Sequence, residues 1–171
     1  MRPGIDEIRQ LGEFQTQYNW NITITPPPGL ASFGNGSEFN TRAQTTALPT
    51  VKNPDIPITL HGFKTNQPGF AEFNGELDVT FVEGVSAIIQ KFFHQWQTIN
   101  FDVKNKGVQA TRAQRETTII LEPYDNNNVT TLTYTLIGCY IEDFIPGTLD
   151  GSKQEMMQPQ AKFRYDYFTT A

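Results

Sequence analysis

The chain is poor in cysteine, in basic residues and in long apolar runs. Its single cysteine, Cys139, excludes a disulfide within the chain, and a cysteine-based zinc site would need an unusual ligand set. Against 18 Asp and Glu there are 13 Lys and Arg, so the net charge of the 171 residues is −5. Because a firm grip on DNA phosphates needs clustered basic residues, this balance argues against a dedicated nucleic-acid site. It still allows DNA to pass nearby without being held.

No segment approaches the length of a membrane-spanning helix, and residues 1–10 lack the apolar stretch of a secretory signal. We therefore expect no membrane partner. The length suits one well-cored domain, and no shift in composition divides it. We predict a single domain over residues 1–171, in which residues 1–16 form a weak helix or an extended N-terminal arm.

The chain instead shows regular patterns of apolar and polar residues, most clearly in residues 76–100. Apolar Leu77, Val79 and Phe81 alternate with polar residues, which predicts a strand with one buried and one polar face. After Gly84, apolar residues recur at helical spacing and predict a helix packed on a sheet. Its apolar side comprises Val85, Ile88, Ile89, Phe92, Phe93, Trp96 and Ile99. Such a stripe could also stack on bases or enter a partner's groove, but a core role is far commoner.

Alternation elsewhere predicts further strands, and glycine, proline and asparagine predict the loops between them. The expected extended segments are Tyr18–Ile24, Glu38–Leu48, Ile56–Gly62, Thr117–Glu122, Thr131–Ile141 and Ala161–Phe168. Thr117–Glu122 and Thr131–Ile141 should form a hairpin across Asp125–Asn128. We expect long loops at Pro26–Asn40 and Gly62–Asn74. Strands buried on both faces would read as continuous apolar runs, so the pattern indicates a mainly β, antiparallel domain with one helix.

Little in the sequence suggests chemistry. His61 and His94 have no metal-ligand spacing, and Cys139 lies in an apolar strand, where an inert thiol is expected. Glu76 and Asp78 share a strand face with α-carbons about 6.7 Å apart, a distance at which carboxylates can cooperate. Solvated acids are the commoner interpretation of such a pair. We predict no enzyme, no cofactor and no metal.

Four motifs, in this order, resemble a known family. They are Arg42–Pro49 (RAQTTALP), Gly75–Val82 (GELDVTFV), Ile89–Gln97 (IQKFFHQWQ) and Lys162–Tyr167 (KFRYDY). Their order and spacing, together with the chain length, resemble the tail tube proteins of contractile-tailed bacteriophages, the T4-like tail tube family. The ring-forming tube proteins of type VI secretion are a more distant resemblance.

The resemblance implies an antiparallel β-sandwich or partly open barrel with one flanking helix. It implies that six subunits close into a ring with a continuous inner β-barrel, and that rings stack into a tube whose lumen conducts double-stranded phage DNA during ejection. The implied partners are the tail sheath, baseplate and tail terminator proteins, in a virion tail assembled in the host cytoplasm. On this basis we expect one of two polar faces to line the lumen: Glu76, Asp78 and Thr80, or Thr131, Thr133 and Thr135. The loops Pro26–Asn40 and Gly62–Asn74 should reach the next subunit or ring.

Other functions remain open at this point. A baseplate protein that initiates the tube would share the fold, and a secretion-system tube subunit would resemble it more distantly. From another class, a monomeric ligand-binding β-barrel would need an apolar cavity. A hydrolase would need Glu76 or Asp78 for activity.

Overall fold

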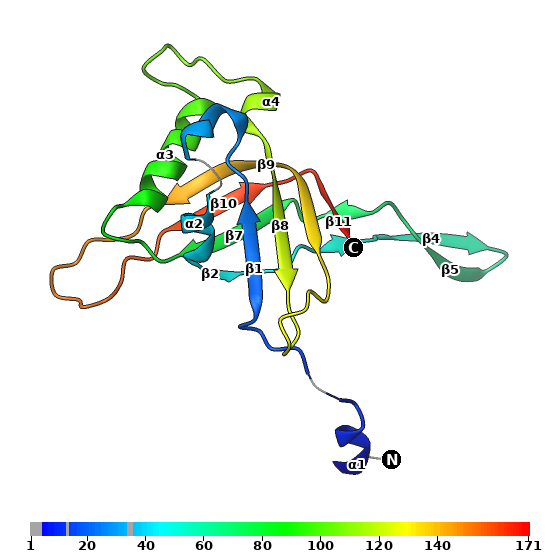
Figure 1. Ribbon diagram of the computed structural model, residues 1–171. Helices are drawn as coiled ribbons and strands as arrows, with labels where there is room; N and C mark the ends of the chain where they lie inside the picture. Colours follow the sequence, from blue (N-terminus) through cyan, green and yellow to red (C-terminus); the bar gives the residue numbers. More distant parts are fainter. Residues whose placement is uncertain (1–4, 13, 34–35) are drawn as a thin grey trace.

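A seven-stranded antiparallel sheet dominates the fold (Figure 1). The computed structural model describes residues 5–12, 14–33 and 36–171. The strand order is β1-β8-β9-β10-β7-β2, and β11 also pairs with β9. The strands are β1 (Trp20–Ile24), β2 (Ala43–Thr46), β7 (Glu76–Phe81), β8 (Thr117–Pro123), β9 (Tyr134–Ile145), β10 (Gln160–Arg164) and β11 (Tyr167–Thr170). The predicted mainly β, antiparallel architecture is confirmed, as is the hairpin of β8 and β9.

Shorter elements surround this sheet. Two small ladders pair β3 (Val51–Lys52) with β6 (Glu72–Phe73) and β4 (Asp55–Leu60) with β5 (Phe63–Pro68). The helices are α1 (Ile5–Arg9), η1 (Pro28–Phe33), α2 (Ser37–Thr41), α3 (Ile88–Asn100) and α4 (Arg112–Arg115). In the described part of the chain, no helix is long and apolar enough to cross a membrane.

The sheet folds over along β9, which is long enough to belong to both halves. Its first half pairs with β8 and β11, and its second half pairs with β10. Gly138 lies at the change of direction with φ +73°, and a Cβ there would be 2.6 Å from an Asp166 carboxylate oxygen. Because only glycine tolerates both the backbone angle and the close contact, this residue permits the bend. The result is the predicted partly open barrel with a flanking helix.

Helix α3 fills the concave side of the bent sheet (Figure 1). Ile89, Phe92, Phe93 and Trp96 are completely buried. The ring of Phe93 lies 5.7 Å from that of Phe163 on β10. The predicted apolar stripe is therefore the core, with Ile88 and Ile99 packed at its margin.

Val85 was predicted to belong to this stripe, and that prediction is wrong. The helix begins only at Ile88, after a turn in which the Ala87 amide donates to the Gly84 carbonyl, and Val85 is fully exposed. The Glu83 carboxylate caps the helix by accepting hydrogen bonds from the amides of Ile89, at 3.3 Å, and Gln90, at 3.0 Å. Residues 84–87 form the turn that this cap requires, so their side chains leave the helical face.

Three other predictions of local structure fail for tertiary reasons. Pro26–Asn40 is not a free polar loop, because Leu30 and Phe39 are buried against α3, where Phe39 stacks on Phe92 at 4.1 Å. The first part of Glu38–Leu48 is accordingly helical (α2) rather than extended. The terminal strand breaks between β10 and β11, because β10 pairs with both β7 and β9 whereas β11 pairs with the first half of β9.

Candidate functional site

The face of the sheet that points away from α3 is polar where β7 and β10 pair. Thr80 lies opposite Gln160, Asp78 opposite Lys162, and Glu76 opposite Arg164. The residues that alternate with them are buried and face α3: Leu77, Val79, Phe81, Ala161 and Phe163. Because successive strand residues point to opposite sides, the polar residues share the outer face. The structure thus brings Glu76, Asp78 and Thr80 together, as predicted.

Two acids and two bases form a closed network on this face. The Arg164 guanidinium contacts a Glu76 oxygen at 2.7 Å and a Glu142 oxygen at 3.0 Å. The Lys162 ammonium lies 3.2 Å from Glu76 and 3.8 Å from Glu142. Each cation therefore touches both carboxylates. The hydrogen bond to Glu76 raises the pKa of Lys162, and the hydrogen bond to Glu142 raises the pKa of Arg164, so both stay charged.

The face keeps an excess of negative charge. Glu142 and Asp143 are adjacent on β9, and adjacent strand residues were expected to point to opposite faces. A register shift at Lys162/Phe163 interrupts the β9–β10 ladder beside them, and both side chains are exposed. Four acids (Glu76, Asp78, Glu142 and Asp143) against two bases (Lys162 and Arg164) leave a net charge of −2.

The alternative lumen face, Thr131, Thr133 and Thr135, does not exist as a strand face. Strand β9 begins at Tyr134, so only Thr135 belongs to it. Thr131 donates to the Pro123 carbonyl through both its amide and its hydroxyl. Thr133 exchanges two backbone hydrogen bonds with Ala171 at the C-terminus. The Thr133 bonds continue the pairing of β9 with β11 by one residue. The Thr131 bonds belong to a wide connection between β8 and β9, in which Asp125 accepts from the amides of Asn127 and Val129.

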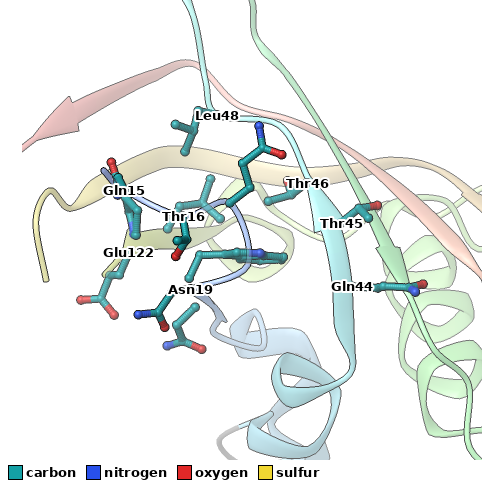
Figure 2. A pocket seen from close by; sticks show the side chains of 13 residues that line it. Gln15, Thr16, Asn19, Gln44, Thr45, Thr46, Leu48 and Glu122 are labelled. Carbon is teal, nitrogen blue, oxygen red and sulfur yellow. The ribbon is translucent and has the colours of Figure 1, made fainter. Parts of the chain in front are cut away.

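The outer strands β1 and β2 face each other across a groove of about 500 Å³ (Figure 2). Residues 15–17 and 19–21 line one side, and residues 44–46 with Leu48 line the other. Polar side chains dominate the labelled lining, among them Gln15, Asn19 and Gln44. In the described residues β1 pairs only with β8 and β2 only with β7, so each strand keeps an edge free for another strand.

The hairpin of β4 and β5 projects from the body (Figure 1). Gly62–Asn74 was predicted to be a loop, but Phe63–Pro68 is a strand in register with Asp55–Leu60. All residues of the two strands except Ile58 are exposed. Leu60 and Phe63, paired next to the turn, are 64% and 81% exposed. An apolar hairpin tip in water is typical of a surface that a partner covers.

The remaining chemically versatile residues lie apart from one another. Among residues 5–12, 14–33 and 36–171, no group of three His, Cys, Asp or Glu side chains is placed to hold a metal ion. His61 occupies the turn of the projecting hairpin, whereas His94 packs edge-on against Phe144. Cys139 is completely buried, and burial raises the pKa of its thiol to about 12.

Sequence reasoning missed two features of this surface. The first is the pairing of Lys162 and Arg164 with Glu76 and Glu142, because alternation shows the face of a residue but not the neighbouring strand. The second is strand β5. Its signal was present, since apolar Ile56, Ile58 and Leu60 precede His61-Gly62, a dipeptide suited to a tight turn.

The sequence is similar to that of a known protein. No protein-family model matches the sequence. The tail tube protein of Serratia phage KSP90 is 26% identical over 144 residues, which cover 84% of this chain and 81% of that protein. The chain is therefore similar in sequence to a phage tail tube protein over most of its length.

The fold of the chain also occurs in contractile injection systems. A chain of the PVC sheath–tube complex in its extended state superposes with a TM-score of 0.65, over 99% of both chains and with 8% identity. A chain of the six-fold symmetrised anti-feeding prophage baseplate gives a TM-score of 0.59, over 94% of this chain and 97% of that one, with 9% identity. At such low identity these likenesses establish the fold alone.

Proposed function

We propose that the protein is a structural protomer of a phage tail tube. Six copies close into a ring, rings stack inside a contractile sheath, and the lumen conducts double-stranded DNA during ejection. The observation that carries this proposal is the relationship to the Serratia phage tail tube protein over 84% of the chain. The six-fold symmetry of the structurally similar baseplate supports the ring size.

The free edges of the sheet give this assembly a physical basis. Exposed edges attract other strands, and a closed barrel removes them. Strand β1 of one copy and strand β2 of the next lie at opposite ends of the strand order, so their joining would continue the sheet from subunit to subunit. Closure of the ring then leaves neither β1 nor β2 with a free edge.

The face of Glu76, Asp78 and Thr80 is our choice for the lumen. Its four acids outnumber its two bases, so it repels DNA phosphates on balance and lets DNA pass without trapping it. The opposite face is filled by α3 and its aromatic side chains. The packed concave side also disfavours a monomeric ligand-binding barrel, which would need that space as a cavity.

The projecting hairpin is our choice for contact between rings. Its tip residues Leu60 and Phe63 are too exposed to stabilise their own subunit, and their burial against another copy would remove apolar surface from water. We no longer assign such a role to Pro26–Asn40, whose Leu30 and Phe39 belong to the core.

A baseplate protein that initiates the tube is the second candidate. It would share the fold, which also occurs in a chain of the anti-feeding prophage baseplate, so the fold does not separate the two candidates. Both functions are structural, and we propose no catalysis. Both place the protein in the virion tail, after assembly in the host cytoplasm, in contact with sheath, baseplate and terminator proteins.

Electron microscopy of the purified protein tests the proposal. Rings or rods support a tube component, whereas a particle that stays monomeric at high concentration and is absent from phage tails contradicts it. Quantitative mass spectrometry of phage particles separates the two candidates. Many copies per tail indicate the tube, whereas only as many copies as one ring contains indicate the initiator.

A further inference from the structure

The two cations of the polar sheet face occupy an unexpected position for a surface that DNA passes. Lys162 and Arg164 alternate with buried residues on β10, which lies between β9 and β7 (Figure 1). Both side chains are more than a third exposed. Free lysine and arginine at this place would bind passing phosphates and slow the DNA.

The acids on the two flanking strands occupy both cations. Glu76 on β7 lies within 3.2 Å of the Lys162 ammonium and 2.7 Å of the Arg164 guanidinium. Glu142 on β9 approaches the same groups from the other side, at 3.8 and 3.0 Å. The Arg164 guanidinium turns one terminal N–H to Glu76 and its Nε–H to Glu142, so two separate donors are engaged. The register shift beside Glu142 is part of this arrangement, because Glu142 and Asp143 are both exposed there.

We propose that Glu76 and Glu142 mask Lys162 and Arg164 from nucleic-acid phosphates, and that the low affinity of this face for DNA depends on that masking. The thermodynamic reason is the source of DNA affinity. Phosphate binding by a basic side chain is favourable because counterions leave the DNA. A cation already paired with two carboxylates must give up these contacts first, which cancels the gain. This inference rests on the proposed lumen position of the face.

Mere repulsion by negative charge would be a different mechanism, and the chain offers a control that separates the two. Glu76→Gln with Glu142→Gln removes two charges and unpairs both cations. Asp78→Asn with Asp143→Asn removes two charges from the same face but leaves all four ion pairs intact. Each double variant takes the net charge of the face from −2 to 0.

The test measures binding of a short DNA duplex by fluorescence anisotropy, at about 50 mM and about 200 mM salt. Masking predicts that the Glu pair variant binds at least about tenfold more tightly than the Asp pair variant at low salt. The slope of the logarithm of its binding constant against the logarithm of salt concentration should be steeper by about 0.9 for each phosphate newly contacted. Adding Lys162→Gln and Arg164→Gln to the Glu pair variant should abolish the gain. Equal affinity of the two double variants would overturn the inference.

Two further measurements keep the outcome decisive. Thermal unfolding shows whether each variant is folded. If the Glu pair variant is not folded, the single variant Glu76→Gln replaces it. Electron microscopy of the same samples separates this inference from the proposed function. Rings with no difference in DNA affinity refute the masking alone, whereas unassembled wild-type protein refutes the tube.

Discussion

Arg164 and Glu76 lie directly opposite each other on β10 and β7, with 2.7 Å between guanidinium nitrogen and carboxylate oxygen. The pair sits on the outer face, over buried Leu77 and Phe163, which flank it in sequence. This ion pair therefore forms only when β7 and β10 keep this register. A shift of β10 by one residue would turn Lys162 and Arg164 toward the core and expose Phe163.

Reversal of charge at Glu76 should disturb this register. Glu76→Lys places a third cation beside Lys162 and Arg164, and like charges directly across a ladder are destabilising. We expect a lower urea midpoint than for Asp55→Lys, the same kind of charge reversal on the exposed strand β4, where the residue opposite is Pro68. Equal midpoints would show that the network contributes nothing to folding.

Loss of the Glu83 cap should weaken helix α3. Its carboxylate accepts the amide hydrogens of Ile89 and Gln90, which otherwise lack a partner at the start of the helix. We expect Glu83→Ala to lower the free energy of unfolding by about 1 kcal/mol, the usual value of a cap. Glu155→Ala, in an exposed loop, is the control, and urea denaturation is the measurement. A loss no greater than that of the control would contradict the assigned cap.

The bend of β9 should require Gly138. Alanine at φ +73° is strained, and its Cβ would collide with the Asp166 carboxylate. We expect Gly138→Ala to cost at least about 1 kcal/mol of stability. Gly151→Ala provides the comparison, because nothing lies within 4 Å of that position and its φ is ordinary. Similar unfolding midpoints for both variants would refute the need for glycine at the bend.

Alkaline pH should destabilise the fold partly through Cys139. Burial raises the pKa of its thiol from 9.0 to about 12, so the unfolded chain loses this proton at lower pH than the folded one. Stability from this group is complete below pH 9 and falls between about 9 and about 12, by up to about 1.4 kcal/mol per pH unit. Unfolding at several alkaline pH values should show a shallower decline for Cys139→Ala than for wild type. Parallel declines would mean that the thiol is not buried as described.

Apolar residues at the hairpin tip should serve assembly rather than folding. Leu60→Ser with Phe63→Ser should leave the unfolding midpoint unchanged, because both side chains are exposed in the subunit. The same variant should form fewer or shorter rods by electron microscopy. Val85→Ser, at a fully exposed position next to α3, is the control for a general loss of apolar surface. Normal rods from the hairpin variant would exclude this contact between rings.

The sequence predicted best the elements whose pattern is local. Alternation in Leu77, Val79 and Phe81 and helical spacing in Phe92, Phe93 and Trp96 identified core residues that are all buried. The sequence pattern did not predict which residues are buried where contacts between distant segments determine burial. Phe39 is isolated in a polar stretch and becomes core only because Phe92 lies against it.

The candidate site was predictable to a similar extent. The face of Glu76, Asp78 and Thr80 followed from alternation alone. The ion pairs of Lys162 and Arg164 with this face depend on a pairing between residues more than eighty positions apart, which no local pattern specifies. The predicted hairpin included Thr131 and Thr133 in a strand, but the wide β8–β9 connection delays the strand to Tyr134.

A cryo-EM reconstruction of the assembled protein tests the central claim most directly. The account predicts stacked six-fold rings in which β1 of each subunit adjoins β2 of the next, with Glu76, Asp78 and Arg164 facing the lumen. A monomer under all conditions, or a ring with this charged face turned outward, would contradict it.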